Sequence, residues 1–144
     1  MDRRVFLALP LSAGTAAAAT IPAEDFAAAE RAILAGRAPV EAGIAIEMPR
    51  LSENGNSVDI AVRVDSPMTA VDHVTAIHIL AEKNPVPGVA RFTLTPRAGR
   101  AAVATRIRLA TTQTILALAE TSTGRVHRAA AEVIVVLGAC VEGG

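Results

Sequence analysis

The residue of this sequence best suited to chemistry is its single cysteine, Cys140. A cysteine thiolate is a nucleophile and can form or exchange S–S bonds. Only four residues follow Cys140, in a segment with almost no large side chains, so the cysteine has little to pack against. An odd cysteine in an exported protein indicates an intermolecular bond or a reactive thiol. We therefore expect the Cys140 thiol to be an attachment point that is presented to other molecules. The alternative is an adventitious cysteine that is merely exposed to solvent.

The segment 138–144 favours such a presentation. Glycine has no side chain that would block entry into a partner's pocket, and it lets the backbone change direction. The predicted carrier arm comprises the neighbours of the cysteine: Gly138, Ala139, Val141, Glu142, Gly143 and Gly144. The segment contains no histidine, and the negative charge of Glu142 disfavours a thiolate. Activation of the thiol is therefore expected to come from the partner that receives the arm.

Other chemistries find little support in the sequence. The three histidines, His73, His78 and His127, are dispersed and do not have the ligand spacing of a zinc site, so we expect no metal. Glu53 and Asp59 are interpreted as turn and surface residues, since no aromatic residues nearby could build a pocket around them. The sequence has no G-x-S-x-G motif. We therefore expect a protein that is not an enzyme and needs no cofactor.

Composition limits the classes of partner. The 144 residues include 14 basic and 14 acidic side chains, and this balance disfavours nucleic acid as a partner. Trp and Tyr are absent, and Phe occurs three times, so platforms for base stacking are not expected. The length predicts one domain with a core of Val, Ile, Leu and Ala.

The N-terminal segment is typical of an export signal. Arg3 and Arg4 precede an apolar run over 5–11, and small residues with A-x-A spacing fill 12–19. The arginine pair followed by Val and Phe resembles the twin-arginine signal. We expect residues 1–19 to be removed after twin-arginine export, which leaves a periplasmic protein without a membrane segment. The alternative is an uncleaved anchor, but the run is short and interrupted by proline and glycine.

Residues 20–137 are expected to form one domain. The helical spacing of apolar residues predicts a helix over 24–35 that stops at Gly36. Beyond it, alternation of apolar and polar residues and short apolar runs, separated by turn sequences, predict about seven strands. The predicted strands lie at 43–48, 58–65, 74–80, 89–95, 103–109, 114–120 and 126–137. This pattern indicates an all-β fold, an immunoglobulin-like antiparallel β-sandwich with one helix ahead of it.

Several segments, in order along nearly the whole chain, resemble the SoxY family of thiosulfate-oxidation carriers. The first is the Glu53-Asn54-Gly55 turn within 51–58. The others are Asp65-Ser66-Pro67-Met68, Ile77-His78-Ile79-Leu80-Ala81-Glu82-Lys83-Asn84-Pro85, Thr105-Arg106-Ile107-Arg108-Leu109-Ala110 and Ala119-Glu120-Thr121-Ser122-Thr123-Gly124.

The resemblance implies a periplasmic sulfur carrier without catalytic activity of its own. Members of this family pair with a second small sandwich subunit, SoxZ, and attach sulfur intermediates to a cysteine near the C-terminus, which Cys140 matches. The resemblance further implies three visiting enzymes: a cytochrome complex with haem c, a metal-dependent hydrolase that releases sulfate, and a sulfane dehydrogenase.

The tail departs from the family pattern. The family arm usually reads Gly-Gly-Cys-Gly-Gly, whereas here Ala139 precedes the cysteine and Val141 and Glu142 follow it. These side chains add bulk and a negative charge beside the thiol. We expect a divergent carrier, and the alternative is a binding or structural module that has kept the fold and the partner interface without the cysteine chemistry.

Overall fold

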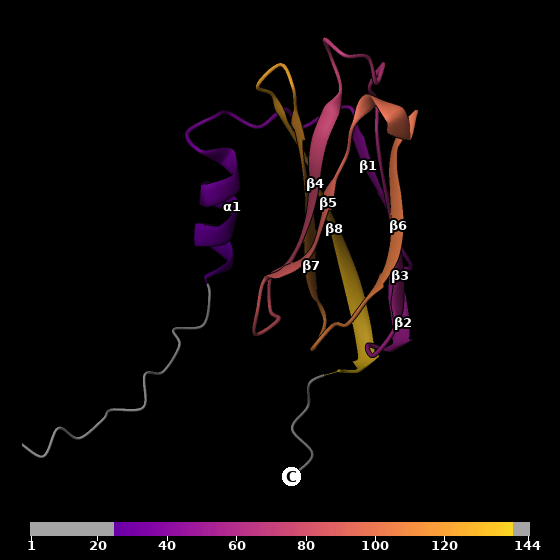
Figure 1. The fold of residues 1–144 in the computed structure, drawn as a ribbon. Helices are drawn as coiled ribbons and strands as arrows, with labels where there is room; N and C mark the ends of the chain where they lie inside the picture. The colour runs from indigo at the N-terminus through magenta and orange to yellow at the C-terminus, as the bar shows by residue number, and fades with distance from the viewer. Residues whose placement is uncertain (1–24, 140–144) are drawn as a thin grey trace, which may run out of the picture.

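The computed structural model describes residues 25–139, which contain one α-helix, one short 3-10 helix and eight β-strands (Figure 1). The helix α1 spans Phe26–Leu34, and the 3-10 helix η1 spans Pro96–Ala98. The strands are β1 (Ile44–Glu47), β2 (Leu51–Asn54), β3 (Val58–Val64), β4 (Val74–Ala81), β5 (Gly88–Thr93), β6 (Ala101–Ile107), β7 (Gln113–Thr121) and β8 (Val126–Leu137). The predicted all-β sandwich with an N-terminal helix is confirmed.

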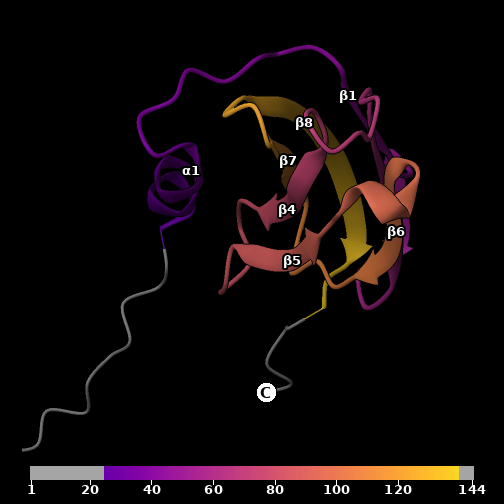
Figure 2. The same cartoon turned by 45° about the horizontal axis from the view of Figure 1, so that its top comes forward.

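The strands form two sheets that pack face to face (Figure 2). One sheet has the strand order β1-β3-β6, and the other has the order β2-β8-β7-β4-β5. The core between them is aliphatic, with Val62, Ile77 and Ile115 fully buried. Within residues 25–139, no helix has the length and apolar character that crossing a membrane requires.

The burial of each strand follows from what covers its two faces. β3 alternates between buried and exposed residues along most of its length, because its outer face meets solvent. β7 is buried on both faces: Ile115 and Ala117 pack against the facing sheet, whereas Leu116 and Leu118 pack beneath α1. This double coverage explains why β7 reads as a continuous apolar run in the sequence.

The structure adds a strand that the sequence analysis assigned to a turn. β2 is four residues long and pairs with β8 through Leu51 opposite Ile134 and Ser52 opposite Val135. This is the one parallel pair among the described strands, whose other pairings are antiparallel. So short and polar a segment has no alternation of its own to detect, and its pairing depends on a strand about 80 residues later.

The helix agrees closely with its predicted range. The Asp25 carboxylate caps its first turn by accepting a hydrogen bond from the Ala27 N–H at 3.0 Å. Its end lies at Ala35, which adopts the left-handed conformation one residue before Gly36. Phe26 and Ile33 pack on the outer face of the five-stranded sheet, and this contact holds the helix on the sandwich.

An ion-pair network also joins α1 to β8. Arg128 donates a hydrogen bond to Glu30 at 2.7 Å and another to Glu41 at 3.2 Å, and the side chains of Arg128 and Glu30 are 26% and 20% exposed. The hydrogen bond to Glu30 raises the pKa of Arg128 above its usual value, against the effect of burial. The network therefore fixes the helix and the segment after it to the same strand.

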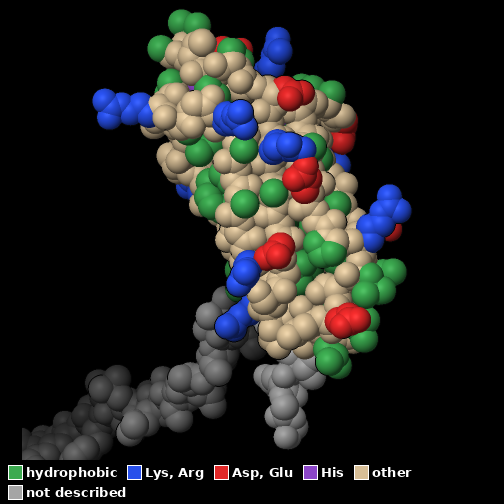
Figure 3. Space-filling model, turned by 90° about the vertical axis from the view of Figure 1, so that its right-hand side faces the viewer, with side chains coloured by type: hydrophobic (Ala, Val, Ile, Leu, Met, Phe, Trp, Pro, Cys, Tyr) green, Lys and Arg blue, Asp and Glu red, His purple; other side chains and the backbone are tan. Residues whose placement is uncertain are grey.

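The outer face of the three-stranded sheet also carries ion pairs, but these are exposed to solvent (Figure 3). Arg63 of β3 bonds Glu47 of β1, and Arg106 of β6 bonds Asp59 of β3 at 3.0 Å. The Arg106 and Asp59 side chains are 76% and 81% exposed. Such exposed pairs contribute little to stability because water screens them.

We expect Arg128→Ala to lower the free energy of unfolding by about 2 kcal/mol, because two carboxylates lose a half-buried guanidinium. Arg106→Ala is the matched control and should change this free energy by less than about 0.5 kcal/mol. Urea unfolding of both variants measures the difference. Equal losses in the two variants would contradict a special role of Arg128 in holding the helix.

Candidate functional site

The root of the C-terminal tail is held where three segments meet at one end of the sandwich. The Gly55 N–H donates a hydrogen bond to the Leu137 carbonyl at 2.7 Å, and the Leu109 N–H donates one to the Gly55 carbonyl at 2.8 Å. The Ala139 N–H completes the set by donating to the Leu109 carbonyl at 2.8 Å. The side chain of Ala139 is buried, with 2% exposure. The chain is therefore fixed to the domain up to the residue immediately before Cys140.

Gly55 is the residue that lets these segments approach one another. A Cβ atom at this position would lie 2.4 Å from the Leu109 carbonyl oxygen, 2.9 Å from Cγ1 of Val135 and 3.0 Å from the Ala139 nitrogen. Real Cβ atoms essentially never come this close to a backbone atom. The Glu53-Asn54-Gly55 motif thus has a steric reason for its glycine, namely the close approach of the tail root.

A partly buried polar network supports the same segment from the other side. Asn84 donates to the Arg108 carbonyl at 2.7 Å and accepts from the Ala110 N–H at 3.0 Å. Gln113, which is 4% exposed, donates to Asn84 at 2.9 Å and accepts from the Lys83 N–H at 2.9 Å. The network clamps the backbone on both sides of Leu109, whose carbonyl holds Ala139. Asn84 lies in a segment that resembles the SoxY family, but the sequence predicted no role for it or for Gln113, because each acts through its contact with the other.

Exposed apolar side chains lie on the two strands that lead to the root. Leu51 of β2 and Ile134 of β8 lie opposite one another and are 52% and 53% exposed. Val136 and Leu137, the last residues of β8, are also largely exposed. Clustered exposed apolar residues are typical of surfaces that contact other proteins.

Several predicted site residues lie outside the described residues. These are Arg3 and Arg4 of the export signal, and Cys140, Val141, Glu142, Gly143 and Gly144 of the arm. Gly138 and Ala139 are described, and the hydrogen bond of Ala139 places them at the anchored root.

The histidines lie apart, and each has its own hydrogen-bond partner. The Nδ1 atoms of His73 and His127 lie 3.0 Å and 2.7 Å from the carbonyls of Thr69 and Ala42. His78 lies on β4, and its Nε2 is 2.8 Å from a carboxylate oxygen of Glu120. Across residues 25–139, no group of three or more His, Cys, Asp or Glu side chains could hold a metal ion.

Glu120 is the centre of a cluster that the sequence analysis missed. Its other carboxylate oxygen accepts a hydrogen bond from Arg37 at 2.7 Å. Burial acts to raise the pKa of Glu120, but the hydrogen bonds from Arg37 and His78 and the charges of both groups outweigh it and lower this pKa below its usual value. Arg37 also donates to the carbonyls of Ile33 and Leu34, so the cluster joins the end of α1 to the sheet.

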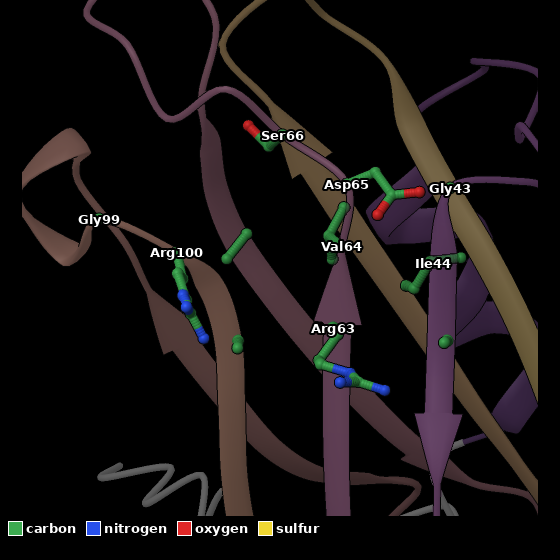
Figure 4. Close-up of a pocket in the computed structure, with 11 residues that line it drawn as sticks. Gly43, Ile44, Arg63, Val64, Asp65, Ser66, Gly99 and Arg100 are labelled. Atoms are coloured by element: carbon green, nitrogen blue, oxygen red, sulfur yellow. The ribbon is translucent and has the colours of Figure 1, made fainter.

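A hollow of about 570 Å³ lies on the three-stranded sheet, where β3 ends and β6 begins (Figure 4). Its polar side chains include Arg63, Asp65, Ser66 and Arg100, and Arg63 already pairs with Glu47. β8 ends at the opposite end of the sandwich (Figure 1), so this hollow is not part of the tail root.

Comparisons with known proteins agree with this geometry. The sequence model of the family described as "Sulfur oxidation protein SoxY" matches residues 30–140. The solved structure of the sulfur carrier protein SoxY from Chlorobium limicola f thiosulfatophilum is 32% identical in sequence, with a TM-score of 0.59. The match covers 74% of this chain and 94% of that one. A comparison with curated protein sequences found no match.

Superoxide reductases share the fold at low sequence identity. The enzyme (neelaredoxin) from Ignicoccus hospitalis is 18% identical, with a TM-score of 0.57 and coverage of 65% of this chain and 80% of that one. A putative superoxide reductase from Thermotoga maritima is 21% identical, with a TM-score of 0.57 and coverage of 67% and 87%. Such identities show a common architecture and nothing about activity. The family match and the identity to the Chlorobium protein, in contrast, show that this chain belongs to the SoxY family of sulfur oxidation proteins.

Proposed function

We propose that this chain is a covalent sulfur carrier subunit of a thiosulfate-oxidising system, with the sulfur intermediates attached to Cys140. The observation that carries the proposal is the family match, which extends over the sandwich and ends at Cys140. The similar protein from Chlorobium is itself described as a sulfur carrier. The anchored root supports the same role, because it ends at the residue before the thiol.

Loading of the carrier is an oxidation. The thiolate sulfur of Cys140 and the outer sulfur of thiosulfate form one S–S bond, and the thiol proton and two electrons leave. A haem c cytochrome complex is the electron acceptor in this proposal. The product is a cysteine S-thiosulfonate, which a metal-dependent hydrolase then converts to a persulfide by attack of water and release of sulfate. A sulfane dehydrogenase would oxidise the remaining sulfur, and the carrier itself catalyses none of these steps.

Tethering gives the carrier a physical advantage over free intermediates. A bound sulfur species reaches each enzyme at a high effective concentration and does not diffuse away. The exposed apolar residues Leu51, Ile134 and Val136 support a stable partner of the second sandwich type, a SoxZ-like subunit, because they leave apolar surface to be covered. Export by the twin-arginine route would place the carrier in the periplasm together with these partners.

Intact-mass measurement of the mature protein tests the proposal. After incubation with thiosulfate and the cytochrome complex of its own host, the wild-type chain should gain the mass of one thiosulfate adduct. Cys140→Ser should gain none, because it lacks the only thiol in the sequence. A carrier with the usual Gly-Gly-Cys-Gly-Gly arm, loaded in parallel, shows that the cytochrome complex is active.

The alternative function is a binding module without carrier chemistry. The substitutions Val141 and Glu142 favour it, since they place bulk and negative charge beside the thiol. Absence of the adduct from this chain, while the usual carrier is loaded, would establish the alternative and reject the carrier.

A further inference from the structure

A second hollow, of about 470 Å³, lies between α1 and the hairpin of β4 and β5. Its walls are apolar: Ala29, Ala32 and Ile33 contribute from the helix and Leu80 from the sheet. Two polar side chains line it, His78 of β4 and Arg91 of β5. A cavity of this size with apolar walls and a few converging polar groups is typical of sites for small molecules.

The carboxylate of Glu120 fixes the orientation of the His78 ring. The ring is largely buried, with 12% exposure, and its Nε2 lies 2.8 Å from Glu120. Because an ionised carboxylate only accepts hydrogen bonds, Nε2 carries the proton. Among the described residues, Nδ1 has no hydrogen-bond partner, so it is the nitrogen that remains available to a ligand. Nδ1 becomes a donor when the ring is protonated.

The charges around the hollow leave a positive surplus. The negative charge of Glu120 is matched by Arg37, which it bonds at 2.7 Å. Arg91 lies directly opposite His78 in the register of β4 and β5, on the same face of the sheet. Within residues 25–139, Arg91 forms no ion pair, so its guanidinium is free to bind an anion. The segment of α1 that lines the hollow contributes no charged side chain.

We propose that this hollow binds a small organic anion, with its anionic group between Arg91 and Nδ1 of His78 and its short apolar body against Ala29, Ala32 and Ile33. The Arg91 guanidinium donates hydrogen bonds to such a group, and Nδ1 of His78 does the same when both ring nitrogens carry a proton. Neither Cys140 nor the proposed carrier role enters this inference. Binding also joins α1 to β5, the edge strand that closes the hollow.

Titration of the ¹⁵N-labelled protein with three probes tests the site. Butane-1-sulfonate has both the charge and the apolar body, methanesulfonate lacks the body, and butane-1-sulfonamide lacks the charge. We expect butane-1-sulfonate to shift the imidazole signals of His78 and to bind about tenfold more tightly than either of the other two. Equal affinity for the sulfonamide would overturn the proposal, because charge would then have no part in binding.

Two variants separate the site from general charge effects. Arg91→Gln should lower the affinity for butane-1-sulfonate about tenfold. Arg97→Gln, the matched control in η1, should leave it unchanged. Since Arg91 and Arg97 are both exposed, neither substitution should disturb the fold. A similar affinity loss in both variants would reject the site in favour of unspecific attraction.

A variant of the histidine supplies an independent measurement. Because His78 lines the hollow, His78→Gln should lower the affinity for butane-1-sulfonate about tenfold. An unchanged affinity in this variant would contradict the assigned role of Nδ1.

Discussion

Gly55→Ala should lower the free energy of unfolding by about 3 kcal/mol, which corresponds to a fall in Tm of about 12 °C for a domain of this size. The added methyl group would lie 2.4 Å from the Leu109 carbonyl oxygen and 3.0 Å from the Ala139 nitrogen. Both are backbone atoms, so no side-chain rotation relieves the contact. Thermal unfolding followed by circular dichroism measures the effect.

Gly88→Ala is the matched control for this experiment. Apart from Gly88 itself and its two chain neighbours, no residue has an atom within 4 Å of the position that a Cβ at Gly88 would take. Its substitution should change Tm by no more than about 2 °C. If Gly55→Ala proves as harmless as Gly88→Ala, the close approach of the three segments at the tail root is wrong.

The second large effect is expected at Glu120. Glu120→Gln should lower the free energy of unfolding at pH 7 by about 2–3 kcal/mol, because Arg37 and His78 lose the carboxylate that both of them bond. Glu132→Gln is the control, since Glu132 is exposed and takes part in no ion pair among the described residues. Urea unfolding of the three proteins gives the free energies.

The direction of the Glu120 pKa shift also predicts a pH dependence. The pKa of Glu120 is lower in the folded protein than its usual value, so its ionised form stabilises the fold. This contribution is complete above the pKa of an unfolded glutamate, about 4.3, and is lost as the pH falls through the folded pKa. The difference between wild type and Glu120→Gln should therefore shrink at acid pH. A constant difference would show that the carboxylate charge has no part in the stabilisation.

Much of the fold could be predicted because its local patterns report burial directly. The alternation over 58–65 has one face in the core and one in solvent, and β3 shows this arrangement. The continuous apolar run over 114–120 reports the double coverage of β7 by the facing sheet and by α1. β2 was missed because its pairing with β8 is set by a partner distant in sequence and not by its own residues.

The candidate site divides in the same way. A lone cysteine among small residues predicts a carrier arm. Residues 140–144 of this arm lie outside the described residues, so the arm stays a prediction. Ala139 is anchored by a backbone hydrogen bond to Leu109, which in turn bonds the backbone of Gly55, and no side-chain pattern encodes these bonds. Glu120 lies 83 positions from Arg37 and 42 positions from His78 in the sequence, so neither contact has a local signature.

The anchored root of the tail limits the reach of the thiol. Adjacent Cα atoms lie about 3.8 Å apart, and Ala139, whose backbone the domain holds, is the residue that precedes Cys140 in the sequence. For a carrier, an enzyme that takes up the thiol must also come close to the end of the sandwich. Two enzymes then cannot occupy the same carrier molecule at once, and each must leave before the next arrives. The rate of the whole sequence of sulfur reactions would therefore be governed by how quickly each enzyme dissociates from the carrier.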